Sequence, residues 1–202
     1  MMKLYGHPDS GHAYKIRFFM LAAGLPHDYE VVDIFSPREQ RQADFRKHAR
    51  YGEVPLLVDG ERALVQSGAI LLYLADRLGQ WGAQDADTLQ RCREWLMWES
   101  NKIGLCLPQL LAHQKFASMR LNDGAHAWLS ARYQHDVGLL EQELADGRAF
   151  IVGEQATIAD FALSGYLMSA NEAKVSVPPQ VQAWLTRMTA LPGWRPPVEL
   201  LS

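Results

Sequence analysis

The sequence predicts an α/β domain followed by an all-α domain. Two observations predict this fold class. Up to about residue 79, short strand-like runs alternate with runs of helical spacing in the order β-α-β-α-β-β-α. From about residue 85 onward, only helical spacing remains. Because a change from strands to helices alone typically marks separate domains, we expect domains at residues 1–79 and 86–202. The segment "GQWGAQDAD" is the expected linker.

The first half of the α/β domain predicts a strand, a helix and a second strand. "KLYG" has the pattern of a short strand, and residues 11–23 carry apolar side chains at helical spacing. "GLP" ends that helix, because glycine favours a left-handed cap and proline cannot continue a helix. "DYEVVDI" is the expected second strand. This strand-helix-strand order requires a parallel crossover connection.

The second half predicts a weak helix, a hairpin and a strong helix. Residues 37–49 are polar with scattered apolar positions, which indicates an exposed helix. "VPLLV" and "RALVQ" flank the turn pair Asp59-Gly60, a hairpin pattern, and an apolar helix then runs from Ser67 to Gly79. A parallel crossover followed by a hairpin predicts a mixed sheet. Helical patterns fill the rest of the chain, at residues 86–119, 123–145, 157–170 and 178–190.

Composition excludes several classes of function. The 202 residues hold 20 Lys and Arg against 23 Asp and Glu, so the chain lacks the basic excess typical of nucleic-acid-binding domains. No apolar run approaches the roughly 20 residues of a membrane span, and "MMKLYGHPD" has no apolar core of a signal peptide. Cys92 and Cys106 are far apart, which indicates buried, reduced thiols and a cytoplasmic location. The histidines show no metal-ligand spacing, so we expect no metal site.

Ser10, in "HPDSGHAYKIRFFM", stands where the first helix begins. The surrounding "PDSGH" is not the G-x-S-x-G elbow of a nucleophilic serine. Two roles stay open. The hydroxyl can cap the helix, or it can join the positive end of the helix dipole in holding an anion such as a thiolate.

Two further stretches carry the same ambiguity. Val54-Pro55 opens an apolar strand, which fits either a trans proline at an edge or a cis proline. In the cis case, the Val54 N–H and C=O would be free to pair with an extended, peptide-like ligand. Gln66-Ser67 begins the strong helix, where Ser67 is either a plain cap or part of a carboxylate site.

Taken together, these stretches resemble the cytosolic glutathione transferases. The resemblance rests on "KLYGHPDSGHAYKIRFFMLAAGLPHDYEVVDI", "YGEVPLLVDGERALVQSGAILLYLADRLG", "FIVGEQATIADFAL" and "LPGW", which together lie between residues 3 and 194. The pair of V-P and Q-S-x-A-I is specific, as is "TIAD". Thr157 and Asp160 of "TIAD" have the spacing of a capping box, so we interpret that motif as structural.

The resemblance implies a thioredoxin-like first domain, a helical-bundle second domain, and glutathione as co-substrate in the cleft between them. It implies that Ser10 contacts the glutathione sulfur. Val54, before a cis Pro55, would pair with the cysteinyl backbone. Gln66 and Ser67 would hold the γ-glutamyl end.

Other implications concern positions where this chain departs from its relatives. The spacing S-x-x-x-x-K, from Ser10 to Lys15, resembles that of the bacterial, serine-type Ser/Thr-x-Asn branch. In this chain, however, His12 stands in place of the asparagine. Gln66 replaces the commoner glutamate. Arg38 either reaches the glycyl carboxylate or is solvated surface. Arg132 is a candidate at a homodimer interface near the ligand.

The expected activity is conjugation of the glutathione thiolate to a hydrophobic electrophile, a detoxification reaction. Two alternatives stay open: a glutathione-dependent disulfide reductase, and a non-catalytic adaptor built on the same fold. We expect no nucleic-acid or membrane partner.

Overall fold

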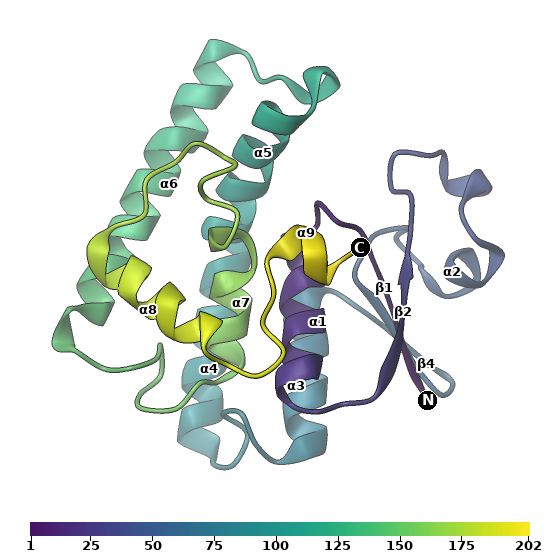
Figure 1. The fold of residues 1–202 in the computed structure, drawn as a ribbon, viewed down its shortest axis with the longest axis horizontal. Coiled ribbons are helices and arrows are strands. Elements are labelled where there is room, and N and C mark those ends of the chain that lie inside the picture. Colours follow the sequence, from purple (N-terminus) through teal and green to yellow (C-terminus); the bar gives the residue numbers. More distant parts are fainter.

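A computed structural model describes residues 1–202 as a small mixed sheet followed by a bundle of helices (Figure 1). The strands are β1 (Met2–Gly6), β2 (His27–Val31), β3 (Leu56–Asp59) and β4 (Arg62–Val65). The helices among them are α1 (Gly11–Ala22), η1 (Arg38–Gln40), α2 (Ala43–His48) and α3 (Ser67–Leu78). The remaining helices are α4 (Ala86–Asn101), α5 (Ile103–Lys115), η2 (Ala117–Met119), α6 (Asp123–Glu143), η3 (Leu144–Asp146), α7 (Ile158–Leu167), α8 (Pro179–Thr189) and α9 (Pro197–Leu200).

The sheet has the strand order β2-β1-β3-β4. β1 pairs in parallel with β2 and antiparallel with β3, and β3 and β4 form the antiparallel hairpin, so the predicted mixed sheet is confirmed. In Figure 1, α1 and α3 lie between the sheet and the helical bundle, and α2 lies on the far side of the sheet. A single hydrophobic cluster joins β1, α1 and α3 to the bundle, whereas a small second cluster lies under α2.

Two expected helices differ in the structure. The exposed helix expected at residues 37–49 is broken into η1 and the short α2, because the Arg41 guanidinium bonds to the carbonyls of Ile34 and Ser36 and holds that stretch as a loop. The long helix expected from residue 86 breaks at Lys102, whose φ of −123° and ψ of −99° are not helical.

The helix α7 brings the second domain against the first. Its N-terminus carries the predicted capping box, in which the Asp160 carboxylate also accepts the indole N–H of Trp184 at 2.9 Å. About two turns further on, Gly165 faces Gly11 so closely that a Cβ at position 165 would lie 2.8 Å from the Gly11 carbonyl oxygen. This contact fixes where α1 begins relative to the bundle. None of the helices combines the length and the apolar character needed to cross a bilayer.

Candidate functional site

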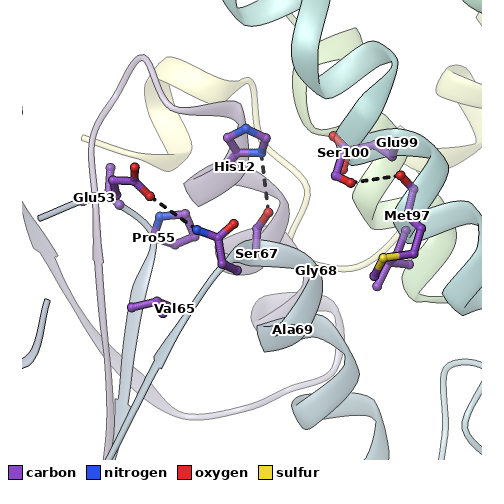
Figure 2. Close-up of a pocket in the computed structure, with 13 residues that line it drawn as sticks. His12, Glu53, Pro55, Val65, Ser67, Gly68, Ala69, Met97, Glu99 and Ser100 are labelled. Atoms are coloured by element: carbon purple, nitrogen blue, oxygen red, sulfur yellow. Dashed lines mark hydrogen bonds between the residues drawn. The ribbon is translucent and has the colours of Figure 1, made fainter. Parts of the chain in front are cut away.

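A pocket of about 530 Å³ opens between the start of α3, the loop before β3 and the C-terminal half of α4. Figure 2 shows Glu53, Pro55 and Ser67 on one side, and Met97 and Ser100 of α4 across from them. The lining residues are His12, Glu53, Val54, Pro55, Val65, Gln66, Ser67, Gly68, Ala69, Leu96, Met97, Glu99 and Ser100. The pocket therefore brings together five predicted site residues: His12, Val54, Pro55, Gln66 and Ser67.

The N-terminus of α3 points its free N–H groups at this pocket. Gln66 is the N-cap residue, with a φ of 69° and no capping bond from its side chain. Ser67 is thus the first helical residue, where the sequence indicated a cap. The N–H groups of Ser67, Gly68 and Ala69 have no acceptor within the chain. A helix start with unpaired N–H groups and a positive dipole end favours a carboxylate.

The loop before β3 presents unpaired backbone to the same pocket. The Val54-Pro55 peptide bond is cis, as one of the two sequence interpretations held. Neither the N–H nor the C=O of Val54 takes part in a hydrogen bond within the chain. Such a residue is able to pair with the main chain of an extended ligand in the manner of an added strand.

The start of α1 also presents hydrogen-bond donors. Ser10 is its N-cap, and its Oγ accepts the N–H of Ala13 at 3.1 Å. That bond uses a lone pair and leaves the hydroxyl hydrogen free to donate. The N–H groups of Gly11 and His12 donate to no backbone carbonyl; both meet the Tyr166 hydroxyl, as does the Ser10 side chain. The cap role is confirmed, and three donors at the end of a helix dipole face one small region.

His12 connects the two helix starts. Its Nδ1 lies 3.5 Å from the Ser67 Oγ, a contact that Figure 2 shows. Burial, with a smaller effect of the Lys15 charge, lowers the His12 pKa to about 3. The imidazole is therefore neutral near pH 7 and acts as a hydrogen-bonding group without a formal charge.

Tyr166 on α7 lies next to these donors, and the sequence analysis did not single it out. Its ring packs on Gly11, where a Cβ would lie 2.7 Å from the ring, and meets the His12 ring edge-on with centroids 4.9 Å apart. Burial raises the pKa of Tyr166 to about 12, so its hydroxyl stays protonated. The only signal in the sequence for Tyr166 was the preceding residue, Gly165, whose small size allows α7 to approach α1.

A buried ion pair forms part of the pocket's floor. The Lys15 ammonium of α1 lies 2.8 Å from a carboxylate oxygen of Glu99 on α4, and both side chains are almost fully buried. The other Glu99 oxygen lies against Gly104, in the first turn of α5. The Glu99 charge is thus balanced by an ammonium and by a helix N-terminus.

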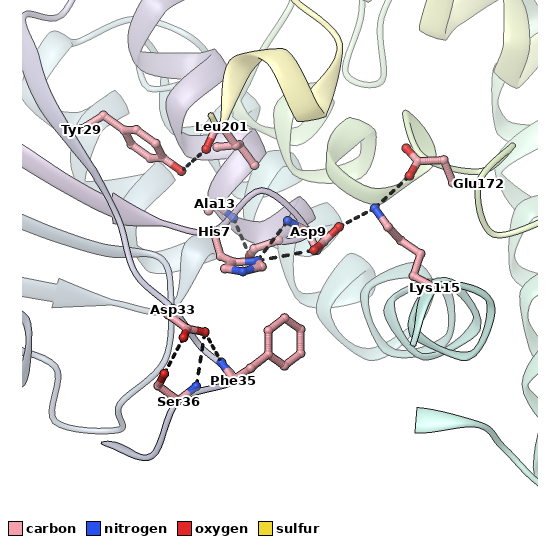
Figure 3. A network of polar contacts seen from close by, with 11 residues as sticks. His7, Asp9, Ala13, Tyr29, Asp33, Phe35, Ser36, Lys115, Glu172 and Leu201 are labelled. Atoms are coloured by element: carbon pink, nitrogen blue, oxygen red, sulfur yellow. Dashed lines mark hydrogen bonds and ion pairs between the residues drawn. The ribbon is translucent and has the colours of Figure 1, made fainter. Parts of the chain in front are cut away.

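The loop that carries Ser10 is held from the other side (Figure 3). The Asp9 carboxylate forms an ion pair with Lys115 at the end of α5, and Lys115 also lies 3.0 Å from Glu172. The Asp9 N–H donates to Nδ1 of His7 at 3.1 Å. These contacts tie the loop before α1 to the helical bundle.

Three predicted site residues do not line the pocket: Ser10, Arg38 and Arg132. The Arg38 guanidinium donates to the carbonyls of Ala49 and Arg50, at the end of α2. Arg132 on α6 donates to the carbonyl of Asn101 at 3.2 Å and lies over the ring of the exposed Trp128.

Comparison with known proteins gives two family matches. Residues 1–76 match the model for the glutathione S-transferase N-terminal domain, and residues 122–187 match that for the C-terminal domain. Among curated proteins, the chain is similar to the dichloromethane dehalogenase of Methylorubrum extorquens, with 24% identity over 95% of this chain and 72% of that protein.

Solved structures of the same family have the same fold. A glutathione S-transferase from Xanthobacter autotrophicus is 29% identical, with a TM-score of 0.85 and full coverage of both chains. A glutathione transferase from Burkholderia graminis, solved with two glutathione molecules per subunit, is 28% identical with a TM-score of 0.82. That match covers 99% of this chain and 87% of the other.

Proposed function

Since the chain belongs to the glutathione S-transferase family, we propose that it binds glutathione in the pocket between α1, α3 and α4 and conjugates its thiolate to a hydrophobic electrophile. The observation that carries this proposal is a pocket lined by the N-terminus of α3 and the unpaired Val54 peptide unit, with His12 connecting it to the N-terminus of α1. Glutathione has a thiol, an extended backbone and carboxylates. The thiol is complementary to the start of α1, the backbone to the Val54 peptide unit, and a carboxylate to the start of α3.

The sulfur lies at the start of α1 in this proposal. A thiolate there accepts hydrogen bonds from the Ser10 hydroxyl and from the N–H groups of Gly11 and His12, beside the Tyr166 hydroxyl that these groups meet in the structure. Hydrogen bonds to an anion stabilise it by about 1.5–3 kcal/mol each, and each pKa unit removed from a thiol multiplies the thiolate fraction near neutral pH almost tenfold. Ser10 acts through the charge of the sulfur and forms no covalent bond.

The remainder of the tripeptide extends toward α3. The Val54 N–H and C=O pair with the cysteinyl unit beside Pro55, and the free N–H groups of Ser67 and its successors take the γ-glutamyl carboxylate. Gln66 adds an amide at that end. Arg38 and Arg132 have no role in this arrangement, since their guanidinium groups donate to the backbone carbonyls of Ala49, Arg50 and Asn101.

The proposal also includes a cytoplasmic homodimer active in detoxification. This part of the proposal rests on the membership of the chain in the glutathione S-transferase family.

Calorimetry of glutathione binding between pH 6 and pH 8 tests the thiolate role, with the wild type beside Ser10→Ala and the control Ser10→Thr, which keeps a hydroxyl. We expect the wild type to release a proton on binding near neutral pH, and Ser10→Ala to bind while releasing far fewer. With an activated chloroarene as electrophile, kcat/KM of Ser10→Ala should fall by about ten- to a hundredfold, the loss equivalent to one charged hydrogen bond.

Other outcomes contradict parts of the proposal. Equal proton release by the wild type and Ser10→Ala excludes Ser10 as the thiolate donor. If the wild type releases a proton on binding and turns over mixed disulfides but not the chloroarene, the glutathione-dependent disulfide reductase is favoured. Failure of the wild type to bind millimolar glutathione leaves the non-catalytic adaptor.

A further inference from the structure

Tyr166 extends from the helical domain to the start of α1, where the glutathione sulfur is proposed to lie. Its hydroxyl meets three groups there: the Ser10 side chain and the N–H groups of Gly11 and His12. Burial raises the pKa of Tyr166, and these three contacts act in the opposite direction. Contacts that lower the pKa of an acid are donors to its anionic form. The Tyr166 oxygen therefore faces the same donors that would hold a thiolate.

The Tyr166 side chain is held in place by close packing. Tyr166 is 7% exposed, and all other residues of α7 are buried as well. Its ring lies against Gly11, where an added Cβ would be 2.7 Å from the ring, and it meets the His12 ring edge-on. A hydroxyl fixed in this way needs little reorganisation when a charge develops beside it.

The hydrogen bonding of Tyr166 differs from that of two other buried tyrosines. The Tyr14 hydroxyl donates to the carbonyl of Arg195 at 3.1 Å, and the Tyr133 hydroxyl donates to the carbonyl of Ser176 at 2.9 Å. Tyr166 is met by donors instead. A phenol oxygen that accepts hydrogen bonds keeps its own proton for a further acceptor. Tyr166 therefore has a proton to offer at the start of α1.

This proton stays on the oxygen when a thiol ionises. Burial, with a smaller effect of the Glu99 charge on α4, raises the pKa of Tyr166 to about 12. The ordinary pKa of a cysteine thiol is about 8.5. The other charged or titratable groups nearby do not reverse this order, because Lys15 is paired with Glu99 at 2.8 Å and the pKa of His12 is lowered to about 3. Tyr166 can therefore donate to a thiolate and does not act as its base.

We propose that the Tyr166 hydroxyl is a second hydroxyl donor to the glutathione thiolate, supplied by the helical domain in addition to Ser10. This inference rests on the proposed function and adds a catalytic residue to it. The thiolate takes the donors of α1 from the first domain and the phenol proton from α7 of the second. The sulfur site is then complete only when the two domains pack together.

Titration of the thiol of bound glutathione, followed by the ultraviolet absorbance of the thiolate, tests this role. It compares the wild type with Tyr166→Phe, which keeps the ring that packs on Gly11. The control Tyr14→Phe removes a buried hydroxyl of α1 that donates to the Arg195 carbonyl and does not line the pocket.

We expect Tyr166→Phe to raise the pKa of the bound thiol by about one to two units, the shift for one hydrogen bond to a charged group. Below that pKa, kcat/KM with the activated chloroarene should fall by about ten- to a hundredfold. This loss should shrink as the pH rises, because the thiolate then forms in both proteins. Tyr14→Phe should leave the thiol pKa unchanged.

A wild-type thiol pKa in Tyr166→Phe overturns the inference, while the proposed function stands. A lower thiol pKa in that variant overturns it as well, since Tyr166 would then compete with the sulfur for the donors of α1. A wild type that gives no thiolate signal with millimolar glutathione overturns the proposed function itself, and the inference with it.

Discussion

His12 is the residue at which the two helix starts of the pocket meet, and its protonation is a property of the folded state. Above pH 6.5, the ordinary pKa of histidine, the imidazole is neutral in the folded and in the unfolded chain. Between pH 6.5 and about 3, the unfolded chain binds a proton that the folded chain does not. The free energy of unfolding must therefore fall as the pH falls through this window.

We predict that this contribution removes at most about 3 kcal/mol of stability between pH 7 and pH 4.5. Urea unfolding of the wild type and of His12→Gln at both pH values measures it, since glutamine keeps a polar side chain and does not titrate. The variant should lose less stability than the wild type on acidification. An identical pH dependence of the two proteins contradicts the lowered pKa of the half-buried imidazole.

At the scale of elements, the crossing of α1 and α7 places the Ser10 donors. Gly165 leaves no room for a side chain, because a Cβ there would lie 2.8 Å from the Gly11 carbonyl oxygen. A Cβ added at Gly138, inside α6, would have no neighbouring atom within 4 Å. Gly138 therefore serves as a matched control.

We predict opposite effects of alanine at these two glycines. Gly165→Ala should lower the free energy of unfolding by about 1–3 kcal/mol, because the two helices must separate. Gly138→Ala should raise it by up to about 1 kcal/mol, because alanine replaces glycine in a helix without a clash. The midpoints of urea unfolding of the two variants, compared with that of the wild type, measure both changes in stability. A stabilising Gly165→Ala would show that α1 and α7 separate at no cost.

At the scale of the whole molecule, the Lys15–Glu99 pair joins the two halves of the chain. Its partners are 84 positions apart in sequence and lie on α1 and α4, beneath the pocket. Removing one partner leaves an unpaired charge in the interior, which costs more than removing both.

We predict that Lys15→Met and Glu99→Gln each lower the free energy of unfolding by about 3–5 kcal/mol. The double variant Lys15→Met/Glu99→Gln should recover much of that loss, because it buries no charge. A double-mutant cycle from urea unfolding measures the coupling. Additive losses would mean that the two charges do not interact in the folded protein.

Much of the architecture follows from the sequence alone. Caps, glycines and prolines predicted the ends of α1 and α3, the β3–β4 hairpin and the change to helices, because these signals act within a few residues. The same local signals pointed to Ser10, Val54 and Ser67 as candidates. The boundaries of α2 and the break at Lys102 were not predicted, since side-chain contacts such as those of Arg41 decide them.

The sequence by itself determined the order of the elements and the polar groups that begin them. Only the tertiary structure decided which groups from distant segments share the pocket. It packs Tyr166 against the start of α1 and pairs Lys15 with Glu99. Helix caps and turns are set by neighbours along the chain, whereas burial and charge pairing depend on residues that meet only when the two domains pack together.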